Sequence, residues 1–359
     1  MGPDNVTLSW TPGFGAKLHT VYFGDNYDDV SNAAVGVPAG AATYNPGRLE
    51  LEKVYHWRVD EFDGSSTYKG NVWAFTTPGA AGNPQPARGA TGVQITAQLS
   101  WTPAANAASH QVYFGEDKDA VRNATTASPE YKGSKALGDE TLDPGKLAWY
   151  SPYYWRVDAV YNTGTVKGLV WSFTTADFLL VDDFESYNDI DPPDPASNRI
   201  FDNWIDGFGT TTNGALVGND LPPYAERTIV HGGSQSMPYR YDNNLKTSEA
   251  TLTLVNPRDW TEEGVTKLSL WFRGNRANAA ERMYVALNGS AVVYHADSKA
   301  TQIGTWIEWV IDLPAFQGVT LTDVNTITIG FGTKNSLAAG GSGKMYFDDI
   351  RLYRQRSAP

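Results

Sequence analysis

An internal repeat constrains the fold of this chain more than any other feature of its sequence. Residues 8–12, Leu-Ser-Trp-Thr-Pro, recur as residues 99–103, which lie 91 positions later. Residues 21–24, Val-Tyr-Phe-Gly, recur as residues 112–115 at the same offset. Two copies of one small domain therefore occupy the first half of the chain.

In the second part of each copy, the offset between the two copies is larger, and the side chains alternate as in a β-strand. Residues 57–60, Trp-Arg-Val-Asp, recur as residues 155–158, now 98 positions on, which predicts a seven-residue insertion within residues 124–154. Apolar side chains alternate with polar ones at Tyr55, Trp57 and Val59, the period-2 signal of a half-buried strand. Short strands of this kind, separated by turn clusters, favour a small β-sandwich.

Composition extends this prediction to the whole chain. There are 12 Trp, 19 Tyr and 14 Phe among 35 Gly and 20 Pro, which is typical of aromatic strands cut by turns, so we expect an all-β protein. A formal charge of −12 argues against a nucleic-acid partner. No apolar run is long enough to predict a membrane span or a signal peptide. The absence of cysteine excludes disulfides and thiol chemistry.

The repeats resemble fibronectin type III-like modules, with Leu-Ser-Trp-Thr-Pro, Val-Tyr-Phe-Gly and Trp-Arg-Val as strands of an immunoglobulin-like sandwich. We predict modules at residues 1–78 and 79–177, joined by a linker at residues 78–86. Only seven residues precede the repeated segment in the first module, so its first strand is expected to be truncated. The resemblance implies spacer modules of a larger exported protein, in which case a missing signal peptide says nothing about export.

Two acidic clusters bracket the remaining residues, 178–356. The segment 182–185, Asp-Asp-Phe-Glu, opens this part and 347–350, Phe-Asp-Asp-Ile, closes it, each within a β-prone run. We predict that these first and last strands pair side by side in a β-sandwich jelly roll. Carboxylates and carbonyls are the ligands that calcium prefers, although solvated turn acids are the simpler alternative.

Further segments give this part a second resemblance, to carbohydrate-binding modules of the calcium-stabilised jelly-roll type. They are Gly-Ser-x-Ser at 233–236, Leu-Ser-Leu-Trp-Phe-Arg-Gly at 268–274 and the terminal Phe-Asp-Asp-Ile. The resemblance implies a structural Ca²⁺ between the first and last strands. Its implied ligands are Glu185 with Asp348 or Asp349, then Asp183, and a carbonyl near Ser234 or Gln235.

Strand parity suggests where a sugar binds. Leu268, Leu270 and Phe272 alternate with Trp271 and Arg273, so we expect Trp271 and Arg273 on the face opposite the core. An indole that stacks on a sugar ring beside an arginine that binds its hydroxyls forms a suitable platform. Further predicted ligand contacts are Tyr284, Asn288, Tyr294 and the loop residue Trp204. Burial in the core is the competing interpretation for each aromatic residue.

These patterns predict a non-catalytic, extracellular polysaccharide-binding protein, whose native chain also carries a catalytic domain. One alternative is a polysaccharide lyase or glycoside hydrolase within residues 178–356. It would use Glu308, His295, or His231 near Tyr239 and Tyr241, and it requires titratable groups converging beside Trp271. Another alternative is a surface adhesin that recognises protein, which requires an exposed apolar patch. The identity of the polysaccharide does not follow from the sequence.

Overall fold

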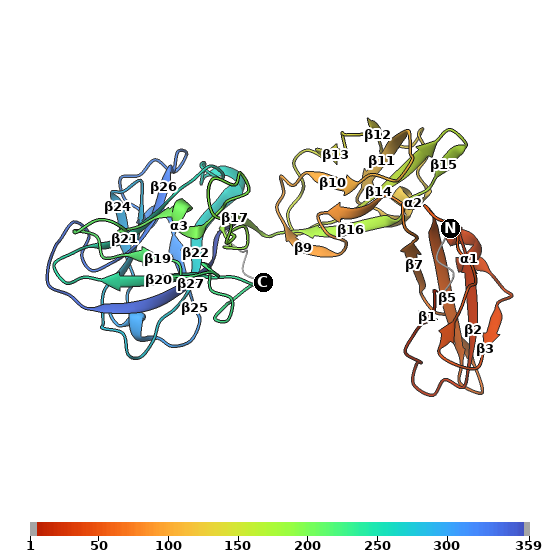
Figure 1. The fold of residues 1–359 in the computed structure, drawn as a ribbon, viewed down its shortest axis with the longest axis horizontal. Coiled ribbons are helices and arrows are strands. Elements are labelled where there is room, and N and C mark those ends of the chain that lie inside the picture. Colours follow the sequence, from red (N-terminus) through yellow and green to blue (C-terminus); the bar gives the residue numbers. More distant parts are fainter. Residues whose placement is uncertain (1–5, 355–359) are drawn as a thin grey trace. The chain divides into compact units, whose positions relative to one another are not determined.

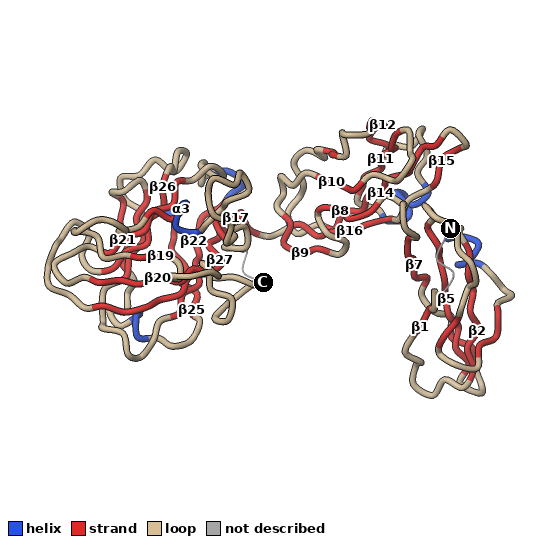
Figure 2. The backbone as a smooth tube through the Cα atoms, viewed as in Figure 1, coloured by secondary structure: helices blue, strands red, loops and turns tan. Residues whose placement is uncertain are grey.

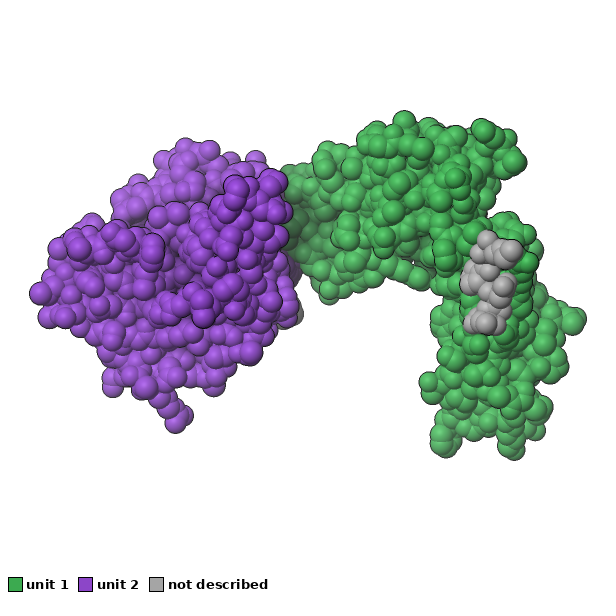
Figure 3. Space-filling model, viewed as in Figure 1, with its two compact units in different colours: residues 1–176 green, residues 177–359 purple. Residues whose placement is uncertain are grey.

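The computed structural model describes residues 6–354, and strands joined by loops make up nearly all of it (Figure 1, Figure 2). The predicted all-β class is confirmed. The chain divides into two compact units, unit 1 (residues 1–176) and unit 2 (residues 177–359), coloured separately in Figure 3. No helix in the described part is long and apolar enough to cross a membrane. The expected truncation of the first strand concerns residues 1–5, which lie outside the described residues.

The first repeat of unit 1 folds into a small sandwich. One sheet has the order β3-β2-β5-β6, with β7 also paired to β5, and β1 pairs with β4 across from it. A six-residue helix follows β2, and the Asn26 side chain caps its first turn by accepting hydrogen bonds from two main-chain amides. The elements are β1 (Leu8–Ser9), β2 (Leu18–Gly24), α1 (Tyr27–Asn32), β3 (Val37–Ala39), β4 (Thr43–Tyr44), β5 (Val54–Phe62), β6 (Thr67–Tyr68) and β7 (Val72–Thr76).

The second repeat has the same plan with longer strands. Its sheets have the orders β13-β10-β8 and β12-β11-β14-β16-β9, with β15 on β14. Part of the predicted linker is itself a strand, because β8 pairs with β10. The elements are β8 (Gly82–Gln85), β9 (Ala90–Val93), β10 (Leu99–Thr102), β11 (Ser109–Gly115), α2 (Lys118–Asn123), β12 (Tyr131–Ala136), β13 (Thr141–Leu142), β14 (Pro152–Tyr161), β15 (Gly164–Val166) and β16 (Val170–Thr175).

The repeated Trp-Arg-Val-Asp segment has a structural role. In β14 the buried Arg156 forms a two-pronged ion pair with Asp158, with Nε–Oδ1 and Nη2–Oδ2 distances of 2.7 and 3.0 Å. The same guanidinium donates to the main-chain oxygens of Val121, Arg122 and Ala124 at the end of α2. A cation at this position satisfies carbonyls that have no partner within the helix and complements the helix dipole.

The first repeat contains the same arrangement. Arg58 pairs with Asp60 and donates to the last carbonyls of α1, at Val30, Ser31 and Ala33. Each carboxylate also accepts a main-chain hydrogen bond from a glycine, Gly70 in the first repeat and Gly168 in the second. We call each Arg–Asp pair the Arg–Asp clamp, because it fastens the short helix to the central strand.

Unit 2 is a sandwich of two sheets. Sheet A has the order β19-β20-β27-β22-β25, with β17 on β27, and sheet B has the order β18-β21-β26-β23-β24. The elements are β17 (Phe178–Asp182), α3 (Ile200–Asn203), β18 (Trp204–Ile205), β19 (Leu216–Val217), β20 (Met237–Asp242), β21 (Ser248–Thr253), η1 (Glu262–Gly264), β22 (Val265–Arg273), β23 (Met283–Leu287), β24 (Ala291–Tyr294), η2 (Ala300–Gln302), β25 (Ile307–Asp312), η3 (Leu313–Ala315), β26 (Thr326–Phe331) and β27 (Ser342–Arg354).

The first and last strands of unit 2 pair with each other, as the acidic clusters at residues 182–185 and 347–350 predict. β17 runs antiparallel to β27, with Phe178 opposite Tyr353 and Asp182 opposite Ile350. β27 is therefore hydrogen-bonded to β17, β20 and β22 (Figure 1). Alternate residues of both sheets point inward and form one core, to which sheet A gives Leu268, Leu270 and Phe272, and sheet B gives Met283, Val285 and Ile329.

Candidate carbohydrate-binding face

Of the predicted ligand contacts on the outer side of sheet B, only Tyr294 reaches the surface. Met283, Val285 and Leu287 point into the core, so Tyr284 between them points to the other side of the sheet, where its side chain is fully buried and offers no ring to a ligand from solvent. Tyr294 lies opposite Tyr284 on β24, and their rings meet edge to face with centroids 5.4 Å apart. The Tyr284 ring lies over Gly330 of β26, where any Cβ atom would collide with it.

Charged groups join these tyrosines into one network. Glu249 of β21 accepts a hydrogen bond from the Tyr284 hydroxyl at 2.5 Å and forms an ion pair with Lys334 at 2.8 Å. The main-chain amide of Lys334 donates to the Tyr294 hydroxyl at 3.0 Å. Burial and the Glu249 carboxylate raise the pKa of Tyr284, which keeps its hydroxyl protonated as a donor. Glu249 and Lys334 were not among the sequence-predicted contacts.

A shallow hollow continues this face beyond the ends of β23 and β26. The Arg282 guanidinium lies 3.9 Å from the centre of the Tyr294 ring and also lines the hollow, whose volume is about 150 Å³. Glu281, Lys246 and Thr333 complete its polar wall. An accessible aromatic ring, here that of Tyr294, beside a few fixed hydrogen-bonding groups is typical of sites for small polar ligands.

Trp271 and Arg273 do not belong to this face. Trp271 lies opposite Glu308 on sheet A, whereas Tyr284 and Tyr294 lie on sheet B, so the expectation that they form one surface is wrong. His231 also covers Trp271, with ring centroids 3.7 Å apart and planes within 15° of parallel. The indole surface expected to stack on a sugar is therefore already partly occupied by an imidazole.

Two other predicted ligand contacts, Trp204 and Asn288, instead form hydrogen bonds within the fold. Trp204 is fully buried in the core of unit 2, and its Nε1 donates to Asp182 at 2.8 Å, so it offers no ring to a ligand from solvent. Asn288 lies in the turn between β23 and β24, where its amide oxygen accepts from the main-chain amides of Asn325 and Thr326. Its amide nitrogen donates to the Asp323 carbonyl.

The predicted calcium ligands cluster beside the pairing of β17 with β27. Glu185 accepts hydrogen bonds from the amides of Ser234 and Gln235, both at 2.8 Å, and from the Ser234 hydroxyl at 2.6 Å. These two residues thus present N–H groups to Glu185. Burial raises the pKa of Asp183, and the nearby Glu185 and Asp349 carboxylates add to this effect. Glu185 and Asp349 therefore both repel the Asp183 carboxylate.

The neighbouring aspartates Asp348 and Asp349 have different surroundings. Asp348 is buried and accepts hydrogen bonds from the amides of His231 and Gly232, and burial raises its pKa to about 7. Asp349 lies 2.7 Å from His231 Nδ1 and 2.5 Å from Arg351 Nη2. Asp348 therefore fastens the loop at residues 231–232, whereas Asp349 belongs to the carboxylate cluster.

Carboxylate oxygens are the kind of donor that a hard cation such as calcium prefers, but those of Glu185 and Asp349 already accept hydrogen bonds in this structure. All three carboxylates offer oxygen, and the loop at residues 232–233 lies so close to two of them that a Cβ on Gly232 would come within 2.6 Å of Asp349. Among residues 6–354, no three His, Asp or Glu side chains are arranged to hold a metal by themselves. Main-chain carbonyls or water would have to complete the shell, as they commonly do for calcium.

The catalytic residues considered from sequence are only partly assembled. Tyr239 and Tyr241 are buried in the core, so they are not partners of His231 in a cleft. The His231–Asp349 pair does lie beside Trp271, and Glu308, opposite Trp271, accepts a hydrogen bond from Ser269 at 2.6 Å. His295 instead packs edge-on against Phe272 and Trp309.

Comparison with known proteins gives only distant similarities. No protein-family profile matches the chain, and no curated protein sequence matches it. Solved structures that resemble parts of it include the family 11 carbohydrate-binding module of the cellulosomal cellulase Lic26A-Cel5E of Clostridium thermocellum. That module is 18% identical, with 43% of this chain and 95% of the module covered and a TM-score of 0.28.

Two further structures show the range of these similarities. The family 30 carbohydrate-binding module of the cellulase Cel9D-Cel44B of Clostridium thermocellum is 12% identical, covering 43% of this chain and 98% of the module, with a TM-score of 0.29. The β-1,2-glucanase of Parabacteroides distasonis is 17% identical, covering 40% of this chain and 24% of the enzyme, with a TM-score of 0.30. At these TM-scores, a function for this chain has to rest on its own residues.

Proposed function

We propose that unit 2 binds a polysaccharide, without cleaving it, through the outer face of sheet B. The observation that carries the proposal is the ion pair of Glu249 with Lys334, joined to the hydroxyls of Tyr284 and Tyr294. These groups are already held in place, so ordering them on binding costs little free energy. The half-buried Tyr294, whose ring packs against the Arg282 guanidinium, supplies an aromatic surface, and Arg282 and Lys334 supply charge-assisted donors to sugar hydroxyls.

We further propose that unit 1 is a tandem of fibronectin type III-like modules that serves as a spacer. The strand orders and the recurring sequence segments support this assignment. In an exported multidomain protein, such a spacer would keep an attached catalytic domain close to the glycan that unit 2 holds. Tethering of this kind raises the effective concentration of substrate without new contacts.

Substitution Tyr294→Ala is expected to weaken glycan retention by about tenfold or more, because it removes the ring and one end of the hydroxyl network. The measurement is affinity electrophoresis of the full chain in gels containing β-glucan, xylan or galactan. Trp271→Ala is the matched control, an aromatic truncation on the opposite sheet, and should leave retention within about twofold of the wild type. Loss of retention in Trp271→Ala alone would instead place the site on sheet A.

A catalytic function remains the second candidate because the His231–Asp349 pair lies against Trp271. The same polysaccharides are therefore incubated with the protein while new reducing ends and absorbance at about 235 nm are followed, since lyases create unsaturated products. We expect neither signal to rise. A rise that His231→Ala abolishes would make unit 2 an enzyme.

We also propose that calcium binds at Asp183, Glu185 and Asp349. Its positive charge would offset the repulsion of Asp183 by the other two carboxylates. Calcium at about 100 times its dissociation constant is expected to stabilise unit 2 by about 2.7 kcal/mol. Calorimetry of the chain in calcium and in a chelator measures this shift. Asp349→Asn should abolish the response, whereas Asp312→Asn, on the exposed edge strand β25, should retain it. Identical melting curves with calcium and with chelator would refute the site.

A further inference from the structure

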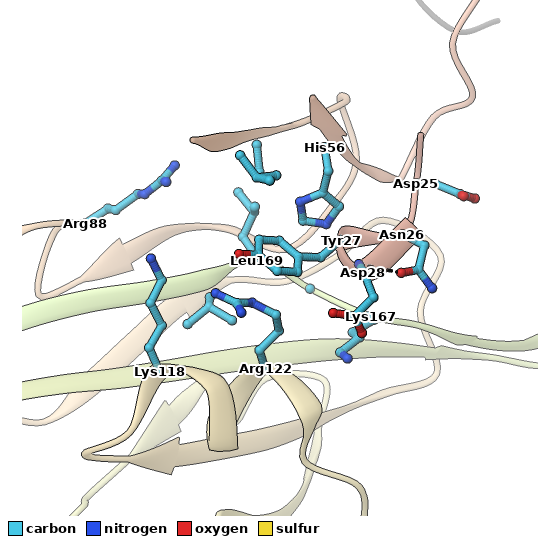
Figure 4. Close-up of a pocket in the computed structure, with 14 residues that line it drawn as sticks. Asp25, Asn26, Tyr27, Asp28, His56, Arg88, Lys118, Arg122, Lys167 and Leu169 are labelled. Carbon is cyan, nitrogen blue, oxygen red and sulfur yellow. Dashed lines mark hydrogen bonds between the residues drawn. The ribbon is translucent and has the colours of Figure 1, made fainter. Parts of the chain in front are cut away.

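Unit 1 contains a cavity of about 240 Å³ between its two repeats (Figure 4). The first repeat contributes the start of α1 and the strands β5 and β7, and the second contributes α2 and the segment before β16. Direct contacts hold the repeats together around it. The Arg122 guanidinium lies 3.6 Å from the centre of the Tyr27 ring, and Asn106 donates to Glu52 at 3.0 Å.

Positive side chains dominate the wall of this cavity. Arg88, Lys118, Arg122 and Lys167 line it, against Asp25 and Asp28 (Figure 4). Arg122 is paired with Asp119, whereas Arg88, Lys118 and Lys167 form no hydrogen bond or ion pair with any described residue. Three cations that form no direct ion pair with a described residue thus line one small cavity in a protein whose formal charge is −12, although Asp28 and Asp158 attract Lys167 from a distance. Local potential, rather than net charge, governs binding at such a site.

His56 adds an unused hydrogen-bonding group. Its Nδ1 is buried and has no partner among the residues that the structure describes. Its ring lies edge-on to Tyr27 at a centroid distance of 5.7 Å and faces the cavity (Figure 4). Burial lowers the pKa of His56 to about 4, and the charges of Arg122 and Lys167 act in the same direction, opposed by Asp25 and Asp28. A buried polar atom without a partner is costly unless something binds it.

We propose that this cavity binds an acidic sugar residue, with the cations around its uronate carboxylate or sulfate ester. The other residues of the cavity wall suit the hydroxyl and C–H groups of a sugar ring. The Asp28 carboxylate offers acceptors and the Asn26 amide nitrogen a donor to sugar hydroxyls, and Val72, Leu169 and Val170 offer an apolar surface to ring C–H groups. Two carboxylates in the wall disfavour more than one negative charge inside the cavity, whereas a single charged residue of a hydroxyl-rich oligosaccharide complements this mixture. The site is separate from the face proposed in unit 2.

The proposal is tested by calorimetric titration of the full chain with tetragalacturonate and with a sulfated galactan tetrasaccharide. Their neutral counterparts are the galacturonate methyl ester and the desulfated tetrasaccharide. We expect at least one acidic oligosaccharide to bind and its neutral counterpart to fail. Lys118→Glu and Lys167→Glu should each weaken binding by roughly tenfold. Lys132→Glu, the same change of charge outside the cavity, should change it less than about twofold.

A second readout separates this site from unit 2 and from non-specific attraction. The imidazole of His56 is followed by NMR, and the bound acid should raise its pKa, because an anion offsets the charges of Arg122 and Lys167. Tyr294→Ala should change neither the affinity for the acidic oligosaccharide nor the shift in the His56 pKa. The proposals for unit 1 and unit 2 can therefore be refuted independently of each other. The proposal is overturned if neither oligosaccharide binds, if Lys132→Glu weakens binding as much as Lys167→Glu, or if inorganic sulfate binds as tightly as the sulfated sugar.

Discussion

Substitution Arg156→Met should lower the free energy of unfolding of unit 1 by about 3–5 kcal/mol. Arg156 is 1% exposed, and its removal leaves Asp158 charged and buried without its partner. It also leaves three carbonyls at the end of α2 without their donor. A typical domain is stabilised by only about 5–15 kcal/mol, so this repeat should unfold at a much lower urea concentration. Tryptophan fluorescence reports the transition, because Trp155 precedes Arg156 in β14.

Two controls separate the Arg–Asp clamp from a general effect of losing an arginine. Arg88→Met removes the same charge at an exposed position and should change stability by less than about 0.5 kcal/mol. The double substitution Arg156→Met with Asp158→Leu should be less harmful than Arg156→Met alone, because no unpaired carboxylate stays behind. If the double variant is the less stable of the two, the cost does not arise from the buried charge.

Asp182→Ala should destabilise unit 2 by about 2–5 kcal/mol, since it removes the acceptor of three buried donors. Asp182 accepts from the Tyr187 hydroxyl at 2.6 Å, from Trp204 Nε1 at 2.8 Å and from the Phe184 amide at 2.8 Å. Asp182→Asn keeps a single acceptor oxygen, which can serve either the Phe184 amide or the Tyr187 and Trp204 donors but not both, so this variant should lose less stability than Asp182→Ala. Urea denaturation of unit 2 in chelator measures both changes.

The adjacent Asp183 provides the comparison for this prediction. Asp183→Ala, measured in the same chelator, should be neutral or slightly stabilising, because it relieves repulsion from Glu185 and Asp349. Equal losses for Asp182→Ala and Asp183→Ala would contradict the assignment of Asp182 as the anchor of Tyr187 and Trp204.

Strands could be predicted where apolar and polar side chains alternate. Residues 55–59 and 268–273 show this alternation, and they lie in β5 and β22. β20 was not expected because a proline, Pro238, lies inside it, although its apolar side chains alternate along the strand and it pairs along its length with β27. The six-residue helices α1 and α2 were also missed. Their capping residues, Asn26 and Asp117, were the signal that was available.

The candidate site was less predictable than the fold, for a geometric reason. Parity tells which side chains leave a strand on the same side, but it does not tell to which sheet the strand belongs. Trp271 and Tyr284 both point away from the core, yet they lie on different sheets. Lys334 comes from a loop, where no periodicity exists to place it beside Glu249. Trp204 follows a short helix and lies in the core.

The central position of β27 in sheet A also governs when unit 2 can fold. β17 and β27 are neighbours in space but lie about 170 residues apart in sequence, and β20 and β22 pair with the same late strand. During synthesis, the segments that form sheet A therefore leave the ribosome before their shared partner β27. Their apolar side chains remain exposed until β27 has been made. Closing loops of this length is slow and exposes unpaired edges to aggregation. Unit 1, whose strands pair over shorter separations, can complete its sheets while unit 2 is still being made.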